Sequence, residues 1–303
     1  MLKIQNLVRP AILLLWLAVV GWHVRREYFK PMTMRLAEGA RSLAPGTYFY
    51  TVRMNGAAIG YAQTRLDTVP AGFVFSDRVV LDVPALNELH RAVAQTRIEL
   101  GPVLQLQRFA FQLGSEIGEF AVRGTVRADG RLDLELNAGG KAQHSTVPMD
   151  PQLLLDAAVP IRLAAAGELD VGTTVRALVF DPSVMAERSV DLRVSARDTV
   201  IVPDSARWNG QHWIASAYDT IPVWRVEQTF AGITIGNWVD EDGHLVRAES
   251  QLGYTLERTA FELADQDWKR AQQSAASRYA CFCSRLAPAR CSPRRRPEPF
   301  KAS

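Results

Sequence analysis

Cysteine is scarce in this chain of 303 residues, and the body of the protein has none. The three cysteines, Cys281, Cys283 and Cys291, stand near the C-terminal end, so no disulfide bond joins the segments before them. Without a nearby histidine they also fall short of the four ligands that a structural zinc site uses. Because a cysteine-free fold suits oxidising and reducing surroundings alike, cysteine usage leaves the compartment open.

The signatures of common active sites are also lacking. No serine stands in a G-x-S-x-G elbow, and no glycine-rich loop of P-loop spacing precedes a helix. The five histidines occupy no recognised catalytic or metal-binding spacing. The acids at 240–242 lie on a predicted tight turn, where acids are common for backbone reasons. We therefore predict that the chain is not an enzyme and holds no cofactor or metal; a hydrolase with loop carboxylates is the less favoured alternative.

Acidic residues are nearly absent from both ends of the chain. Of the 35 Lys and Arg residues, six lie in 1–35, nine in 269–303 and 20 between them. Of the 32 Asp and Glu residues, each end holds one and the middle holds 30. The body is therefore acidic and repels phosphate backbones. We predict that it binds no nucleic acid, and that any anionic partner meets the basic ends.

Long apolar runs are absent except at residues 11–24, AILLLWLAVVGWHV, which basic residues flank on both sides. This is an export or anchoring signal. As a helix it covers about 21 Å, which is short for a hydrocarbon core of roughly 30 Å, so cleavage as a signal peptide is the alternative. We predict a retained single-pass anchor in a bacterial inner membrane, with a periplasmic body, although the flanking charges do not fix the orientation. The predicted anchor residues are Ala11, Leu14, Leu15, Trp16, Val20 and Trp22.

From Gly46 to Glu262 apolar and polar residues alternate in short segments, which is typical of half-buried strands. Four dipeptides between these segments favour hairpin turns, because their residues tolerate positive φ. The sequence therefore predicts a mainly β fold, either a large curved antiparallel sheet or a partly closed barrel. A split into two sheets near 149–170 is the alternative. The dipeptides are Asn55-Gly56, Asp129-Gly130, Asn209-Gly210 and Asp242-Gly243.

Helical signals are few. We predict one helix at 149–159, begun by Asp150 and Pro151 and ended by Pro160, and a short helical turn at 84–92. From Trp268 onward the alternation is lost and proline and arginine accumulate, which predicts disorder. The expected organisation is an anchor with its juxtamembrane segment at 1–35, a β-rich domain at 36–268 and a basic tail at 269–303.

Two segments, MNGAAIGYAQTRLD at 54–67 and WVDEDGHLVRAESQLGYTLERTAFE at 238–262, carry a family resemblance. They resemble the β-rich extracytoplasmic domain that precedes transglutaminase-like catalytic domains in bacterial membrane-anchored proteins. The resemblance covers about residues 46–262 and implies a fold rather than an activity. The catalytic domain itself is absent, because no histidine follows Cys281 to complete its Cys, His, Asp order. The motif residues at the turns are Asn55, Gly56, Gly60, Asp242, Gly243 and Gly253.

Two functions fit these patterns. The first is a non-catalytic binding or assembly module of the cell envelope, in which a sheet edge or concave face meets a protein or an envelope polymer. The second is a carrier or sensor of an apolar ligand such as a lipid, held in a half-open β cavity. Filling of the core is the simpler explanation for the large aromatic residues. The aromatic residues that would line a cavity are Phe109, Phe111, Trp208, Trp213, Trp224 and Trp238.

Overall fold

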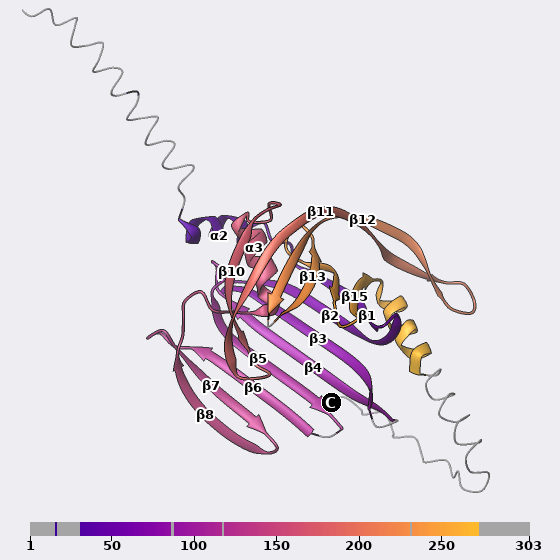
Figure 1. Cartoon of the computed structure of the whole chain (residues 1–303), viewed down its shortest axis with the longest axis horizontal. Helices are drawn as coiled ribbons and strands as arrows, with labels where there is room; N and C mark the ends of the chain where they lie inside the picture. The colour runs from indigo at the N-terminus through magenta and orange to yellow at the C-terminus, as the bar shows by residue number, and fades with distance from the viewer. Residues whose placement is uncertain (1–15, 17–30, 86–87, 117, 231, 273–303) are drawn as a thin grey trace, which may run out of the picture.

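The protein is a single large β-sheet with a few short helices (Figure 1). A computed structural model describes residues 31–85, 88–116, 118–230 and 232–272, together with Trp16. Fifteen strands pair in the order β8-β7-β6-β5-β4-β3-β2-β1-β15-β14-β13-β12-β11-β10-β9. The sheet is curved and is not closed, because β8 and β9 remain its two ends. The predicted fold class, mainly β with one large sheet, is confirmed, and the alternative of two separate sheets is not what the chain forms.

The sheet has two arms that meet where β1 pairs antiparallel with β15. Strands pair antiparallel throughout, except that β9 runs parallel to β10. The first arm comprises β1 (Gly46–Met54), β2 (Ala57–Val69), β3 (Gly72–Ala85), β4 (Glu88–Leu100), β5 (Leu106–Ser115), β6 (Gly118–Val126), β7 (Arg131–Ala138) and β8 (Lys141–Pro148). The second arm comprises β9 (Leu154–Leu155), β10 (Thr174–Asp181), β11 (Ala186–Trp208), β12 (Trp213–Phe230), β13 (Ile233–Val239), β14 (Leu245–Ser250) and β15 (Tyr254–Thr259).

The four predicted hairpin turns are confirmed. Each dipeptide lies between two consecutive, paired strands: β1 and β2, β6 and β7, β11 and β12, and β13 and β14. At the first turn Asn55 and Gly56 have φ values of 50° and 82°, the two positive values that a type I′ turn requires. The antiparallel meander follows from these turns.

The two helices predicted from the sequence do not lie where they were expected. Residues 149–159 hold a turn, the short β9 and a 3₁₀ turn at Asp156–Ala158, and the helix α3 follows at Val159–Ala166. Pro160 therefore lies in the first turn of a helix rather than after its end. A proline there loses no hydrogen bond, because the first amide groups of a helix have no partner within it. Residues 84–92 belong mainly to β3 and β4, which pair up to Ala85 and from Glu88.

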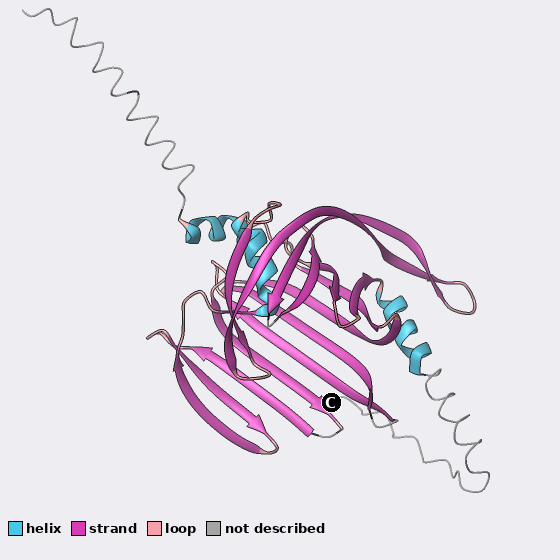
Figure 2. Cartoon of the chain, viewed as in Figure 1, coloured by secondary structure: helices cyan, strands magenta, loops and turns pink. Residues whose placement is uncertain are grey.

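Two further helices were not predicted. Helix α2 (Met32–Ala40) packs against α3 at one end of the sheet, and a C-terminal helix at residues 261–272 lies at the opposite side (Figure 2). The C-terminal helix includes Trp268, where the sequence predicted the start of a disordered tail. The sequence signal for this helix is the helical spacing of Phe261, Ala264 and Trp268, in a segment that has no period of two.

Alternate residues of the first arm form the floor of the core. Leu66, Phe75, Ile98 and Phe109 are successive cross-strand partners on one face, and all four are buried. We call this the buried row and its face the inner face. The ring centroid of Phe109 lies 5.4 Å from that of Phe180 in β10. The second arm, together with α2 and α3, therefore fills the concave side of the first arm.

Candidate functional site

The motif turns of the resemblance meet where the two arms join. The backbone N–H of Asn55 donates a hydrogen bond to the carbonyl oxygen of Gly253 at 2.8 Å. A Cβ atom at Gly253 would lie 2.1 Å from Asn55 Oδ1, and one at Gly243 would lie 2.4 Å from the carbonyl oxygen of Pro160 in α3. Asp242 lies in the same turn as Gly243, and Gly60 in β2 pairs with Leu81 in β3. Asn55, Gly243 and Gly253 therefore lie at contacts between elements.

The aromatic residues predicted to line one cavity lie in several places. Phe109 is buried in the core, whereas Phe111, two residues further along β5, is half-buried with its ring centroid 6.2 Å from that of Phe120. Trp224 and Trp238 point to opposite faces of the sheet, because they occupy adjacent pairs of the β12 and β13 register. Their separation contradicts the idea of a single lining made of all of them.

The other two predicted aromatic residues stack on each other near the end of the long β11–β12 hairpin. The ring centroids of Trp208 and Trp213 are 5.7 Å apart. The amide of Trp213 donates to Gln266 Oε1 at 2.6 Å, and Gln266 Nε2 donates back to the Trp213 carbonyl oxygen at 2.9 Å. The C-terminal helix therefore ties down the hairpin with this pair of bonds, at a distance from Phe111.

A second row of the inner face lies beside the buried row and is only partly covered. Its members are successive cross-strand partners: Tyr48, Thr64, Asp77, Thr96 and Phe111. The last four each lie two residues along their strand from a member of the buried row. Each of the five keeps part of its surface accessible. We call them the Asp77 row. On β3, β4 and β5 these side chains are less covered than those of the buried row.

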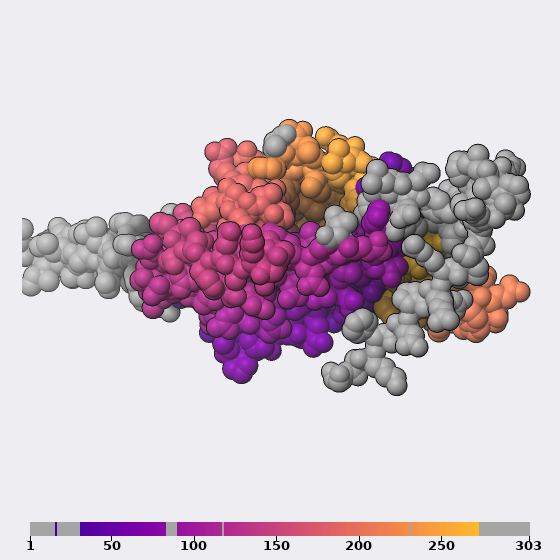
Figure 3. Space-filling view, turned by 90° about the horizontal axis from the view of Figure 1, so that it is seen from below, coloured from indigo at the N-terminus to yellow at the C-terminus, as the bar shows by residue number. Residues whose placement is uncertain are grey.

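The next row along the inner face becomes more open from β1 to β6. Its first members, Tyr50 and Ala62, are buried beneath Leu245 and Leu256. Its later members are apolar and partly exposed, with Leu113 exposed by 37%. Figure 3 shows the molecule hollowed between the purple and magenta strands of the first arm and the orange and yellow segments of the second. We call the members Val79, Ala94, Leu113 and Phe120 the apolar margin. Val79 and Phe120 also pack against buried clusters, and Leu113 is the exposed member.

Asp77 is the charged member of its row. Its Oδ1 accepts a hydrogen bond from Thr64 Oγ1 at 2.9 Å, and it forms no ion pair with any residue that the structure describes. Burial raises the pKa of Asp77 to about 6, against the opposing effects of Thr64 and the Arg78 backbone amide. Protein atoms surround this carboxyl group, yet part of the residue stays accessible.

A polar cluster closes the Tyr48 end of the row. The His244 ring centroid lies 4.7 Å from that of Tyr48, and the Arg258 guanidinium carbon lies 3.7 Å from the Tyr48 ring centroid. Arg258 is 3.5 Å from Asp240, whose Oδ1 accepts the His244 amide at 2.8 Å. Burial raises the pKa of Asp240, and His244 and Arg258 oppose that rise. These groups position the β13–β14 turn, although among the described residues His244 Nδ1 is buried without a hydrogen-bond partner.

The opposite, outer face of the first arm carries a polar trough of about 430 Å³. Arg65 is 2.7 Å from Asp67, and Arg97 is 3.5 Å from Glu99, so arginines of the trough are neutralised by acids of their own strands. Such exposed pairs are typical of a solvated sheet face. The trough is lined by Gln63, Arg65, Ser76, Asp77, Arg78, Gln95, Thr96, Arg97, Ala110 and Gln112. By the period of two, the side chains of Asp77 and Thr96 point to the inner face.

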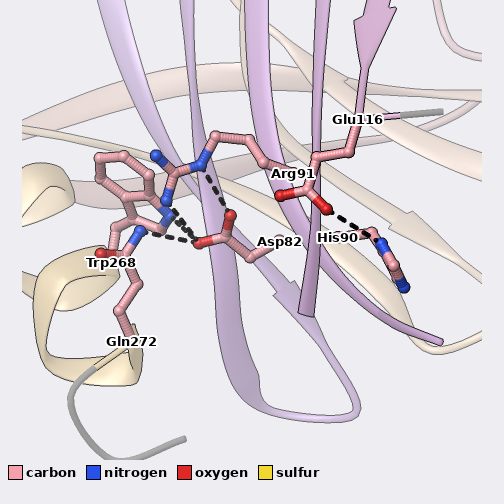
Figure 4. Close-up of polar contacts among 6 residues, drawn as sticks. All are labelled: Asp82, His90, Arg91, Glu116, Trp268 and Gln272. Atoms are coloured by element: carbon pink, nitrogen blue, oxygen red, sulfur yellow. Dashed lines mark hydrogen bonds and ion pairs between the residues drawn. The ribbon is translucent and has the colours of Figure 1, made fainter. Parts of the chain in front are cut away.

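At one end of the outer face the C-terminal helix is fixed to β3 and β4 through Asp82 (Figure 4). Arg91 Nε donates to Asp82 Oδ1 at 2.9 Å, and Trp268 Nε1 and Gln272 Nε2 donate to Asp82 Oδ2 at 2.8 Å each. The Trp268 ring also contacts Arg91 and Tyr61. Nearby, His90 Nδ1 lies 3.2 Å from Glu116. We call the four-residue arrangement of Asp82, Arg91, Trp268 and Gln272 the Asp82 clamp.

The predicted membrane anchor lies outside the described residues, except for Trp16, which is helical and 62% exposed. In the described part of the chain, no helix has the length and apolar character to cross a membrane. No group of three or more His, Cys, Asp or Glu side chains within that same part could hold a metal ion. The cysteines of the tail also lie outside it.

Comparisons with known proteins give distant likenesses in structure. No family model matches the chain, and no curated protein sequence matches it. A β-barrel-like protein of the domain of unknown function DUF1849 from Brucella abortus is 12% identical with a TM-score of 0.44, over 71% of this chain and 95% of that one. A DUF1089 family protein from Pseudomonas aeruginosa is 12% identical with a TM-score of 0.34, over 61% of this chain and 87% of that one. Neither likeness assigns a ligand or an activity.

Proposed function

We propose that this chain is a non-catalytic binding domain of the bacterial cell envelope, and that it holds its partner in the recess formed by the Asp77 row and the apolar margin. The observation that carries the proposal is the open stretch of apolar side chains on a concave face. Such surfaces are the usual lining of binding sites, whereas isolated apolar residues on a convex surface are ordinary.

The chemistry of the recess favours binding over catalysis. The Asp77 row and the apolar margin contain one carboxyl group and no histidine or thiol. General acid–base or nucleophilic catalysis needs a second group within hydrogen-bond reach, and the neighbour bonded to Asp77 is the hydroxyl of Thr64. The recess can therefore orient a ligand without an evident means to cleave it.

The membrane part of the proposal rests on the apolar run at 11–24 and its basic flanks. Helix α2 begins eight residues after Val24, and eight extended residues reach at most about 28 Å. An anchored chain would thus hold the α2 and α3 end of the sheet near the membrane. Alkaline phosphatase fused after Ser303 should be active in intact cells; activity confined to a reporter that works in the cytoplasm would overturn the periplasmic location.

The binding proposal is tested by native mass spectrometry of the full chain purified from a membrane extract. The variant Leu113→Gln places an amide in the apolar margin, and Leu252→Gln makes the same change at a turn where the side chain is 68% exposed. We expect a co-purifying ligand that Leu113→Gln loses and Leu252→Gln retains. A bound small molecule favours the carrier, and a bound protein favours the assembly module. Equal retention by both variants would contradict a site in the recess.

A further inference from the structure

The recess contains a carboxyl group that the protein leaves without a cation. Asp77 accepts one hydroxyl hydrogen bond and one backbone hydrogen bond, and no Lys, Arg or His of the described residues forms an ion pair with it. A charged carboxylate withdrawn from water is costly unless a cation or several donors stabilise it. A ligand that brings a positive group would remove that cost.

The two threonines that pair with Asp77 across the strands add hydroxyl groups that can accept hydrogen bonds. Thr64 on β2 and Thr96 on β4 are its direct cross-strand partners, and all three side chains share the inner face. Directly opposed side chains in a sheet have Cβ atoms about 5 Å apart. An alkylammonium group carries three N–H donors and no acceptor. Asp77, Thr64 and Thr96 together present one charged and two hydroxyl acceptors to such a group.

The surroundings of this acceptor set are apolar toward the open side of the recess. Val79 lies two residues along β3 from Asp77, and Ala94, Leu113 and Phe120 continue its row across β4, β5 and β6. Neighbouring strands lie about 4.8 Å apart, so this apolar path from β3 to β6 extends about 14 Å. Phe111 flanks the path, with its ring near that of Phe120.

We infer that the recess binds an amphiphile that carries a protonated amine, with the ammonium group on Asp77, Thr64 and Thr96 and the hydrocarbon chain along the apolar margin. This inference rests on the proposed function and names the class of its ligand. Charge complementarity selects the occupant, because an anionic or neutral head group leaves the carboxylate uncompensated. On the outer face, by contrast, the acids Asp67 and Glu99 are already paired with Arg65 and Arg97.

The inference is tested with three probes of equal chain length, dodecylamine, dodecanol and dodecanoate, titrated into the full chain in neutral nanodiscs and measured by calorimetry. Hydrogen bonds to charged groups contribute about 1.5–3 kcal/mol, which corresponds to a preference for the amine of roughly ten- to hundredfold. We expect this preference in the wild type, with dodecanoate the weakest binder. The variant Asp77→Asn keeps an oxygen for the Thr64 hydroxyl but removes the charge, so the amine and the alcohol should then bind equally.

Controls separate the two levels of the proposal. Asp67→Asn removes an acid of the outer face and should leave the preference for the amine unchanged. Equal binding of amine and alcohol by the wild type, or an unchanged preference in Asp77→Asn, overturns the role of Asp77. If all three probes bind with equal affinity and Leu113→Gln lowers that affinity, the apolar recess is supported and the amine site is wrong. If none binds to the wild type, both the amine site and a recess for hydrocarbon chains are wrong.

Discussion

Strand β3 carries two carboxyl groups, five residues apart and therefore on opposite faces, which the protein treats in opposite ways. Asp82, on the outer face, accepts hydrogen bonds from three side chains of the Asp82 clamp. Burial works to raise the pKa of Asp82, but hydrogen bonds from Arg91, Gln272 and Trp268 and the charge of Arg91 outweigh it and hold that pKa below its usual range. Asp77 has no such partners, and its pKa is raised to about 6.

Under the proposed function, Asp82 has a structural role and Asp77 has a binding role. The partners of Asp82 all belong to the chain, so its charge stabilises the fold and fixes the C-terminal helix. The charge of Asp77 lowers stability, because protein surrounds it and no cation compensates it. The ammonium group of the proposed ligand would compensate this charge.

Loss of Asp82 should have the largest effect. Asp82→Ala leaves Arg91 without its carboxylate and frees Trp268 and Gln272, and removal of one partner from a buried ion pair costs about 3–5 kcal/mol. Because Arg91 is half exposed, we expect a loss of about 3 kcal/mol in the free energy of unfolding, measured by urea denaturation at pH 7.5. Asp67→Ala, whose partner Arg65 lies in solvent, should scarcely change the midpoint. A loss as small for Asp82→Ala as for this control would show that the clamp is not structural.

Replacement of Asp77 should act in the opposite direction and depend on pH. Since the folded-state pKa of Asp77, about 6, exceeds the ordinary 3.8, the folded state binds the proton more tightly, and stability increases as pH falls from above 6 to below 4. Asp77→Asn should therefore stabilise the chain at pH 7.5 by about 2–3 kcal/mol and have no effect below pH 4. Tyr50 is the titratable neighbour that senses the charge of Asp77, and burial keeps it neutral in this range. A stabilisation independent of pH would refute the buried charge.

The turns and the two faces of β3 could be predicted from the sequence, because both follow from local rules. Asn55-Gly56 and the three similar dipeptides require positive φ, which few residues tolerate. In SDRVVLDV the five-residue spacing of Asp77 and Asp82 places them on opposite faces by the period of two. These features need no knowledge of distant parts of the chain.

The fate of each carboxyl group could not be predicted, because it depends on distant segments. Asp82 meets Trp268 across 186 positions of the sequence, and the expectation of a disordered tail hid that contact. Pro160 shows a similar limit, since a proline can follow the end of a helix or stand in its first turn, and only packing against the sheet decides. The openness of the recess depends on where the second arm stops, which no local pattern encodes.

A milder change to the clamp should produce a smaller loss. Trp268→Phe keeps an aromatic ring for Tyr61 and Arg91 but removes the indole N–H that donates to Asp82. A hydrogen bond to a charged acceptor contributes about 1.5–3 kcal/mol when partly buried; because Arg91 and Gln272 still serve Asp82, we expect a loss of about 1.5 kcal/mol. Hydrogen exchange should also quicken at 261–272. If the loss equalled that of Asp82→Ala, the indole N–H alone would account for the clamp.

The smallest predicted change concerns the hydroxyl that supports Asp77. Thr64→Val preserves the shape of the side chain but removes the hydrogen bond that lowers the pKa of Asp77, so that pKa should rise above its value of about 6. A hydrogen bond to a charged acceptor contributes about 1.5–3 kcal/mol. Because the Arg78 backbone amide still donates to Asp77, the stability lost should be about 1 kcal/mol at pH 7.5 and smaller at pH 3, where Asp77 is protonated in both states. The carboxyl carbon chemical shift of Asp77, followed by NMR through a pH titration, measures the change directly. In the double variant with Asp77→Asn the pH dependence should vanish. If it persisted, another group would titrate in the recess, and Asp77 would not be the source of the pH-dependent stability.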